Sequence, residues 1–430
     1  MRKPLILRGA RQVGKSTLVE MFATEFDCFL KLNLDEKADR DLFVRYKNVD
    51  ELIDAVYFHL KKPKAAGDTL LFIDEIQNSP EAVAMMRYFY EKRPDLYVIG
   101  AGSLLENVID RRISFPVGRV EYLALHPCSF IEYLNGIGEL SDQQAVEEQK
   151  GDFIHERLMS HFRHFCIVGG MPEAINAYAK THDLLASDRI YDALIASYSD
   201  DVEKYSPNNT QTKIMRHILE NGWQRGGEVI SFEQFAGSEY RSRESGEAFR
   251  TLQKAMLLEL VYPTVGTQLP LEAQLSRRPK LIWLDTGLMN YKAEVREEVF
   301  SVTDISSAYR GHVAEQMVAQ ELLSLTTRVT DKRYFWVNSK RNSQAEVDFV
   351  YKYQPYLLPV EVKSGTNAHL RSLHTYMAEA PHDIAIRIWS NPLSVDKVTE
   401  PSTGKEFRLI NVPFYYVCIL DKVIAHVLTM

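Results

Sequence analysis

The chain has 430 residues, of which 45% are hydrophobic and 25% are charged, and its formal net charge is −7. This composition is that of a folded globular protein, which excludes the disordered and fibrous classes. The length predicts roughly two to four domains. The acidic balance argues against a surface coated everywhere with nucleic acid, although it allows local basic patches.

Cysteine usage and hydropathy indicate a protein of the reducing cytoplasm that has no membrane partner. No apolar run reaches the roughly 20 residues that a bilayer-spanning helix needs. The run Leu5–Leu7 ends at Arg8, which makes it too short for a signal peptide, and we interpret it as a buried strand. The four cysteines form no CxxC pair, so neither a disulfide framework nor a zinc site is indicated; they are Cys28, Cys128, Cys166 and Cys418.

A phosphate-binding loop follows this first strand. Residues 9–16 read GARQVGKS, which matches the pattern G-x-x-x-x-G-K-[ST] between a strand and an amphipathic stretch. Glycines let backbone N–H groups curl around phosphates, and the helix N-terminus adds positive potential. We expect Lys15 to contact the phosphates and the Ser16 hydroxyl to bind Mg²⁺. The residues expected to bind ATP are Gly9, Ala10, Arg11, Gln12, Val13, Gly14, Lys15, Ser16 and Thr17.

An acidic strand end supports the phosphate loop. The apolar run Leu70–Ile73 ends in Asp74 and Glu75, as expected for a strand buried on both faces of a parallel sheet. In P-loop NTPases such a strand end lies beside the phosphate loop. Asp74 would then hold Mg²⁺ through water, and Glu75 would orient and deprotonate the attacking water. Solvated carboxylates also end many strands, but the combination with a P-loop favours a nucleotide hydrolase.

Two further residues are candidates for this site. The next buried run, Tyr97–Ile99, is followed by Ser103, which would sense the γ-phosphate at the strand tip; a simple turn is the alternative. Arg119 is a candidate arginine finger that would stabilise transition-state charge in a neighbouring subunit of a homo-oligomer. Surface loops also carry arginines without such a role.

The chain resembles the bacterial and archaeal AAA-family ATPases whose C-terminal region is poorly characterised. The likeness lies in LILRGARQVGKST, LLFIDEIQNSP, VIGAGSLLE and PVGRVEYLALHPCSFIEYL, and it continues in CIVGGMPEAINAYA, AEVDFVY and LPVEVKSG. Similar proteins carry a short segment before the first strand, whereas this chain starts almost on it, so we expect that segment's adenine contacts to be missing. The resemblance implies an α/β protein with an AAA-type ATPase core (1–126), a helical lid (127–208), a winged-helix module (209–295) and a restriction-endonuclease-like domain (296–430).

The middle of the chain is consistent with the helical lid and the winged-helix module. Residues 127–205 have apolar side chains at helical spacing, interrupted at Gly169–Pro172, as a helical lid would. Three histidines occur here without carboxylate or cysteine partners in the pattern, and we interpret them as surface residues rather than as a metal site. They are His155, His161 and His164.

Residues 211–265 predict three short helices and a strand, which is the winged helix-turn-helix plan. The second helix is expected around Phe232–Ala236, the third within Ser242–Leu258 and the strand at Leu258–Tyr262. The third helix would read DNA, but interleaved glutamates leave contact with protein equally open. The arginines that would suit DNA phosphates are Arg241, Arg243 and Arg250.

Residues 345–363 carry the pattern of a PD-(D/E)xK nuclease site. Asp348 lies on one expected strand, and Glu361 and Lys363 share a face of the next because side chains repeat every second residue. Paired carboxylates can share a divalent metal that polarises a phosphodiester and activates water, while the lysine stabilises charge. Glu315, on a helix expected over Gly311–Leu323, would complete the metal ligands.

The same pattern also arises from solvated cross-strand ion pairs, but apolar residues flank each of its members. We expect Tyr334 and Trp336 to pack in the core. Four basic residues precede the site and would suit a phosphate backbone, although a solvated hairpin carries such charges too. They are Lys332, Arg333, Lys340 and Arg341.

Two functions follow from the sequence. The first is an ATP-binding and ATP-hydrolysing AAA-type protein that acts on DNA through a nuclease-like C-terminal domain. The second is a nucleotide-dependent switch whose C-terminal domain is a non-cleaving interaction module, which the acidic net charge favours slightly. A small-molecule kinase is less favoured because long domains follow the P-loop without a recognisable acceptor site.

Overall fold

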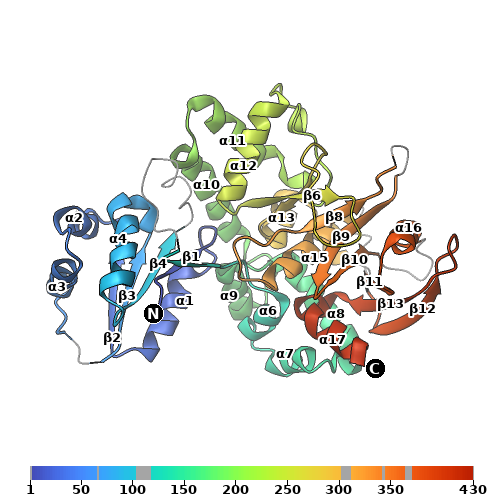
Figure 1. Ribbon diagram of the computed structural model, residues 1–430, viewed down its shortest axis with the longest axis horizontal. Coiled ribbons are helices and arrows are strands. Elements are labelled where there is room, and N and C mark those ends of the chain that lie inside the picture. The colour runs from blue at the N-terminus through green and yellow to red at the C-terminus, as the bar shows by residue number, and fades with distance from the viewer. Residues whose placement is uncertain are drawn as a thin grey trace. The chain divides into compact units, whose positions relative to one another are not determined.

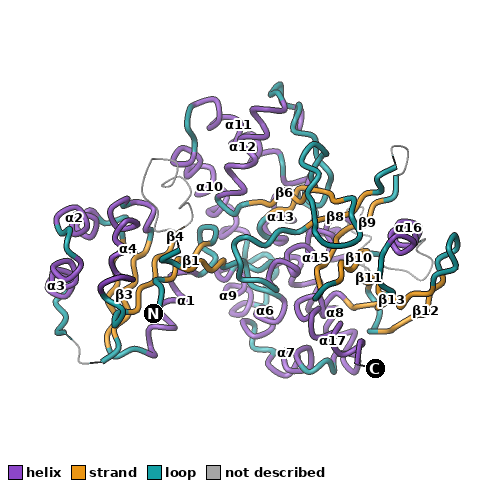
Figure 2. The backbone as a smooth tube through the Cα atoms, in the orientation of Figure 1, coloured by secondary structure: helices purple, strands orange, loops and turns teal. Residues whose placement is uncertain are grey.

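The structure is a computed structural model that describes residues 2–64, 67–102, 118–301, 311–340, 344–363 and 370–429. The chain divides into two compact units, and Figures 1 and 2 show the elements of each. The first unit comprises Met1–His126, Lys254–Met256 and Thr327–Thr330, and the second comprises the remaining residues. Among the described residues, no helix is long and apolar enough to cross a bilayer.

The first unit is built on a parallel sheet whose described strands follow the order β2-β3-β4-β1-β5. Strand β4 therefore separates β1, which leads into the phosphate loop, from β3, which ends in the acidic pair. The strands are β1 (Leu5–Arg8), β2 (Cys28–Asn33), β3 (Thr69–Asp74), β4 (Tyr97–Gly102) and β5 (Glu121–Ala124).

Helices cover both faces of this sheet, as the alternating side chains of β3 require. Leu70 and Phe72 pack with Val19 of α1 on one face. Leu71 and Ile73 pack on the other face, in a larger apolar cluster that includes residues of α2, α3 and α4 (Figure 1). The predicted strand at Leu70–Ile73, buried on both faces, is confirmed. The helices are α1 (Lys15–Phe22), α2 (Lys37–Arg45), α3 (Val49–His59) and α4 (Pro80–Lys92).

The second unit begins with helices, and the helical run is interrupted at the glycines that predict a break. Helix α8 ends at Val168 and α9 begins at Pro172. Gly169 has a φ of +71°, and a Cβ there would lie 2.3 Å from Oδ1 of Asp285, so a side chain is excluded. The helices are α6 (Phe130–Gly136), α7 (Leu140–Glu147), α8 (His155–Val168), α9 (Pro172–Thr181) and α10 (Asp188–Tyr205).

The expected winged-helix segment contains its first and third helices, α11 (Asn209–Asn221) and α12 (Ser242–Lys254). The prediction of a helix around Phe232–Ala236 is wrong, because only a short 3₁₀ turn forms at Phe235–Gly237 and Ala236 has a φ of 50°. Phe232 and Phe235 both pack against the ring of Phe249, and this shared contact explains their helix-like spacing.

A mixed sheet forms the rest of the second unit, and its described strands follow the order β12-β13-β11-β10-β9-β8-β6-β7 (Figure 2). Strand β6 pairs antiparallel with β7 through its first half and parallel with β8 through its second half. The expected wing strand therefore belongs to the same sheet as the C-terminal strands, and the sheet has no break near residue 295. The strands are β6 (Leu258–Thr264), β7 (Lys280–Trp283), β8 (Tyr334–Val337), β9 (Glu346–Tyr353), β10 (Tyr356–Val362), β11 (Ile384–Trp389), β12 (Ser394–Thr399) and β13 (Glu406–Pro413).

Further helices complete the second unit, and one of them carries a buried acid. They are α13 (Thr286–Lys292), α14 (Arg296–Ser301), α15 (His312–Ser324), α16 (Arg371–Glu379) and α17 (Leu420–Thr429). Glu321 of α15 is fully buried, and both of its carboxylate oxygens accept from the Phe130 backbone N–H at 3.2 Å. Burial raises the pKa of Glu321 to about 8, and the nearby Glu132 adds to the rise.

We expect Glu321→Gln to stabilise the protein at high pH. A folded-state pKa of about 8, above the ordinary 4.5, means that the stabilising protonated form is lost as pH rises through this window. The substitution should therefore raise the apparent Tm by roughly 5 °C at about pH 9 and leave it nearly unchanged at about pH 5. Thermal unfolding of both proteins at the two pH values checks this, with Glu297→Gln, an exposed site on α14, as the control. An equal Tm shift at both pH values would contradict it.

Candidate functional site

The phosphate loop connects β1 to α1 in a conformation that its residue types permit. Gly14 has a φ of 95°, which favours glycine, and Gln12 has a φ of 64°. A Cβ on Gly9 would lie 2.6 Å from the carbonyl oxygen of Leu125, so the loop can approach that strand end only without a side chain. Ala10 and Val13 are buried, while Thr17 is exposed on the first turn of α1.

Lys15 begins α1 and is only 7% exposed. Its Nζ donates to the carbonyl oxygens of Gly9 at 3.0 Å and Ala10 at 2.7 Å. Burial lowers the pKa of Lys15, although the charges of Glu75 and Asp74 oppose this shift. The ammonium group thus lies inside the loop, close to backbone that would surround phosphate groups.

The acidic strand end lies against the phosphate loop. The Ser16 hydroxyl donates to Oδ2 of Asp74 at 2.6 Å, and the Glu75 backbone N–H donates to Oδ1 at 3.1 Å. Asp74 is 8% exposed. A hydroxyl and a carboxylate in contact are hard oxygen donors of the kind that Mg²⁺ takes in phosphate sites, so these residues fit the ion that the motifs imply.

Gln77 is a residue of this site that sequence reasoning missed. Its amide donates to the Glu75 carboxylate. A Cβ on Gly102, at the end of β4, would lie 2.1 Å from Oε1 of Gln77, so this side chain lies between the ends of two neighbouring strands. A glutamine two positions after the Asp-Glu pair was the available signal. Ser103, which follows Gly102, lies outside the described residues, and its proposed sensing role stays a prediction.

Arg119 has a partner in its own chain. Its Nε donates to Oε1 of Glu91 on α4 at 2.9 Å, and Arg87 shares that carboxylate. These two side chains lower the pKa of Glu91 through their hydrogen bonds. The arginine-finger role of Arg119 would require this ion pair to break, and it stays a prediction.

The residues of the nuclease-like pattern come together in the second unit. Asp348 of β9 and Glu361 of β10 lie on antiparallel neighbouring strands, next to the paired residues Phe349 and Val360. The Val362 backbone N–H donates to Oδ2 of Asp348 at 2.8 Å. Lys363 donates to Oε1 of Glu361, as expected for residues two apart on a strand.

The helix acid joins this group through a lysine that the sequence did not single out. Nζ of Lys280, at the start of β7, lies 2.6 Å from Oε2 of Glu315, 3.6 Å from Oε1 of Glu346 and 3.8 Å from Oδ1 of Asp348. Lys280 is 1% exposed. We call Lys280, Glu315, Glu346, Asp348, Glu361 and Lys363 the acid–lysine cluster.

The carboxylates of the acid–lysine cluster are crowded, and their side-chain exposure ranges from 2% for Glu361 to 38% for Glu346. Burial raises the pKa of Asp348, and the charge of Glu315 adds to the rise. Burial and then the charge of Asp348 raise the pKa of Glu361 to about 7. Burial lowers the pKa of Lys280, but Glu315, Asp348 and Glu346 together outweigh it, so the net shift is upward. The cluster therefore holds excess negative charge.

The donor set fits a divalent cation. Oε2 of Glu361 is buried and has no hydrogen-bond partner among the described residues. The side chain is only 2% exposed, so bulk water does not reach this oxygen. An orphaned carboxylate oxygen beside a second carboxylate, with hard oxygen donors throughout, suits Mg²⁺ or Mn²⁺. Asp348 and Glu361 would hold such an ion.

The basic residues before this cluster do not all face solvent. Arg333 is largely buried and forms an ion pair with Glu259, so its expected role at a phosphate backbone is wrong. Lys332 and Lys340 are exposed, and Arg341 lies outside the described residues. Trp336 is fully buried and packs edge-on against Tyr376, as expected for a core residue.

The three histidines of the helical region are half-buried, so their interpretation as surface residues is wrong. His155 contacts the Tyr415 hydroxyl at 3.0 Å, and His164 contacts the Tyr178 hydroxyl at 3.1 Å. His161 lies 3.5 Å from Asp142. Side-chain packing between α8 and its neighbours, which is not visible in the local pattern, explains the difference.

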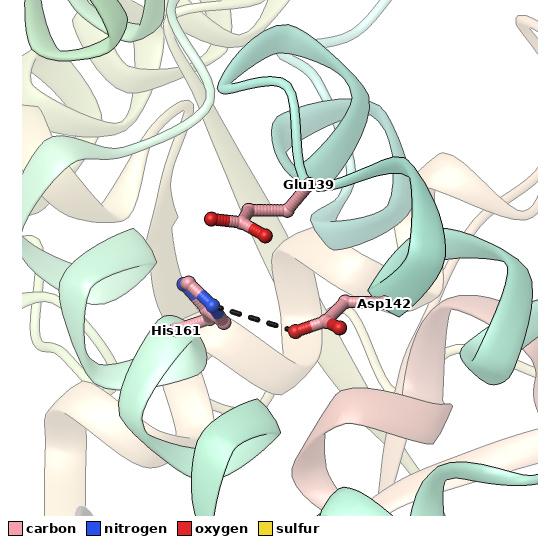
Figure 3. A group of neighbouring side chains, drawn as sticks. All are labelled: Glu139, Asp142 and His161. Carbon is pink, nitrogen blue, oxygen red and sulfur yellow. Dashed lines mark ion pairs between the residues drawn. The ribbon is translucent and has the colours of Figure 1, made fainter.

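His161, Asp142 and Glu139 form a group with metal-ligand atoms near one another (Figure 3). Asp142 is fully buried, and the guanidinium group of Arg157 donates to both of its oxygens. A cation here would have to share the carboxylate with that positive charge. We therefore interpret the group as a structural ion pair.

The arginines on and just before the expected DNA-reading helix, α12, lie in solvent. Arg241, Arg243 and Arg250 are exposed, and the Arg243 side chain is 90% exposed. Nε of Arg243 lies 3.5 Å from a carboxylate oxygen of Glu247 one turn along. The helix thus presents both signs of charge.

Three family models match consecutive parts of the chain. Residues 1–134 match the family model of an AAA domain, and this part of the chain contains the parallel sheet and the phosphate loop. Residues 159–299 and 310–413 match two domains of unknown function, DUF8612 and DUF4143. Lys280 belongs to the first of these and the PD-(D/E)xK pattern to the second. No curated protein matches the sequence.

Solved structures give weak likenesses. The Walker-type ATPase PABY2304 of Pyrococcus abyssi is 16% identical, with a TM-score of 0.42 over 68% of this chain and 91% of that one. The closed state of Hsp104 with ATPγS and FITC casein is 14% identical, with a TM-score of 0.25 over 52% and 49%. Drosophila ORC bound to DNA is 14% identical, with a TM-score of 0.28 over 70% and 91%. These TM-scores are too low to support a conclusion about this chain.

Proposed function

We propose that this protein is a cytoplasmic AAA-type ATPase that hydrolyses ATP with Mg²⁺. The observation that carries the proposal is the 2.6 Å contact between Ser16 and Asp74, which joins the phosphate loop to the acidic strand end. In this proposal Lys15 binds the phosphates, Ser16 and Asp74 hold the ion, and Glu75 deprotonates water. Gln77 is a positioning residue, because its amide orients the Glu75 carboxylate.

We expect Glu75→Gln to separate nucleotide binding from hydrolysis. The amide cannot accept a proton from water, so turnover should fall by roughly 100-fold or more, while the phosphate loop is untouched. Phosphate release measures turnover, and a fluorescent ATP analogue measures binding. Glu51→Gln, an exposed site on α3, should change neither quantity. Turnover at the unsubstituted rate would exclude Glu75 as the base.

For the second unit, we propose a metal-dependent action on DNA at the acid–lysine cluster. Its support is the pair of carboxylates on the neighbouring strands β9 and β10, of which Glu361 is buried and in contact with Lys363. A bound divalent cation would polarise a phosphodiester and activate water. Lys363 would stabilise developing charge, and the exposed arginines of α12 would contact DNA phosphates. A homo-oligomer, in which Arg119 reaches a neighbour's nucleotide, completes this proposal.

A specific observation favours a second candidate, a nucleotide-dependent switch with a non-cleaving C-terminal module. Lys280 is in contact with Glu315, so a protein cation already neutralises one acid of the nuclease pattern. The first candidate predicts DNA cleavage that requires Asp348, whereas the second predicts no cleavage.

A further inference from the structure

Lys280 is held at a fixed place inside the acid–lysine cluster. Its Nζ lies 5.4 Å from the ring centroids of both Phe335 and Phe349, and 2.6 Å from Glu315. Rings and a carboxylate around a buried ammonium group leave it little freedom to move. Because Lys280 lies in the segment matched as one domain of unknown function and Glu315 in the other, both segments are needed to build the cluster.

The two carboxylate oxygens of Asp348 face different parts of the cluster. Its Oδ1 faces Lys280 at 3.8 Å, on the side of Glu315 and Glu346. Its Oδ2 accepts from the Val362 backbone N–H, next to Glu361, whose Oε1 accepts from Lys363 and whose Oε2 is buried without a partner among the described residues. Each side therefore has one ammonium group, Lys280 or Lys363, but only the side of Glu361 has a buried carboxylate oxygen without a hydrogen-bond partner among the described residues.

The charges of the cluster match one divalent ion. Four carboxylates face two ammonium groups, which leaves two negative charges when all six groups are ionised. Carboxylate sites of this size in phosphodiesterases often hold two metal ions. A second divalent ion near Glu315 would lie beside the Lys280 ammonium group, where repulsion at short range in a buried site is strong.

We propose that Lys280 is a built-in cation that takes the place of a second metal ion, so that the cluster binds a single divalent cation at Asp348 and Glu361. This inference rests on the proposed function of the cluster as a divalent-cation site. It assigns Lys280 a positioning role, because the residue sets how many ions bind and holds Glu315.

Manganese binding to the nucleotide-free full chain tests this inference. All proteins carry Asp74→Asn, so that the phosphate-loop site does not contribute, and equilibrium dialysis with electron paramagnetic resonance counts bound Mn²⁺. We expect one Mn²⁺ per chain in the protein that keeps both Lys280 and Asp348, and none after Asp348→Asn. We expect two Mn²⁺ after Lys280→Met, but one after Lys280→Arg, because arginine keeps the positive charge. We also expect Mn²⁺ to raise the Tm of Lys280→Met more than that of the Lys280 protein, because three carboxylates lose their counter-charge.

Each other outcome overturns the inference in a distinguishable way. Two ions bound to the protein that retains Lys280 refute the role of Lys280 and leave the proposed metal site standing. A single ion in Lys280→Met, with an affinity equal to that of the Lys280 protein, does the same. No ion in the protein with intact Asp348 refutes the proposed metal site itself. If Lys280→Met does not fold, Lys280→Gln, which is also uncharged, is counted in its place, and one ion bound there with unchanged affinity refutes the role of Lys280.

Discussion

Replacing Lys15 with alanine is expected to reduce ATP hydrolysis by roughly 100- to 1000-fold and to weaken nucleotide binding. The reason lies in the position of the ammonium group, which donates to two carbonyl oxygens of the phosphate loop and is 7% exposed. Charge stabilisation is strong in such a water-poor site. Phosphate release over a range of ATP concentrations gives kcat and KM for both proteins.

The control must separate loss of this cation from loss of charge in general. Lys31→Ala removes a partly exposed lysine of β2 that pairs with Glu20, and it should leave hydrolysis unchanged. Circular dichroism checks that Lys15→Ala folds, since the side chain also bonds the loop backbone. Hydrolysis by Lys15→Ala at the unsubstituted rate would show that the phosphate loop is not the ATPase site.

The phosphate loop could be predicted because its chemistry is local. Eight consecutive residues specify the loop, and an unbroken apolar run predicts the buried strand that ends at Asp74. The contact between Ser16 and Asp74 spans 58 positions, yet it follows from parallel strands whose carboxyl ends share one edge of the sheet. Each local pattern here agrees with the tertiary fold.

Other features depend on contacts that leave no local pattern. Lys280 is a single lysine at the start of a short apolar strand, and only the packing of α15 places its ammonium group against Glu315, 35 positions later. Arg333 looks like an exposed base in the sequence, but its partner Glu259 is 74 positions earlier. The same non-local pairing joins β6 to β8, so the sheet crosses the expected boundary between modules.

The acid–lysine cluster makes the other large prediction: Asp348→Ala should abolish metal-dependent cleavage of DNA. Asp348 is the carboxylate that faces both Lys280 and the strand of Glu361, so its loss removes a proposed metal ligand and leaves Glu361 alone. Nicking of supercoiled plasmid with Mg²⁺ or Mn²⁺ should fall by roughly 100-fold or more. Asp331→Asn, at an exposed position of the same unit, is the control and should cut as the unsubstituted protein does.

The pH dependence of this cleavage adds a test that a contaminating nuclease would not reproduce. Burial raises the pKa of Glu361 to about 7, and it raises the pKa of Asp348 as well, so protons compete with a metal ion below that range. Cleavage should therefore rise between about pH 6 and about pH 8, and added Mn²⁺ should shift the rise to lower pH. If the unsubstituted protein cuts no faster than Asp348→Ala at any pH, the cluster does not cleave. The second unit would then act as an interaction module, with Lys280 neutralising its acids.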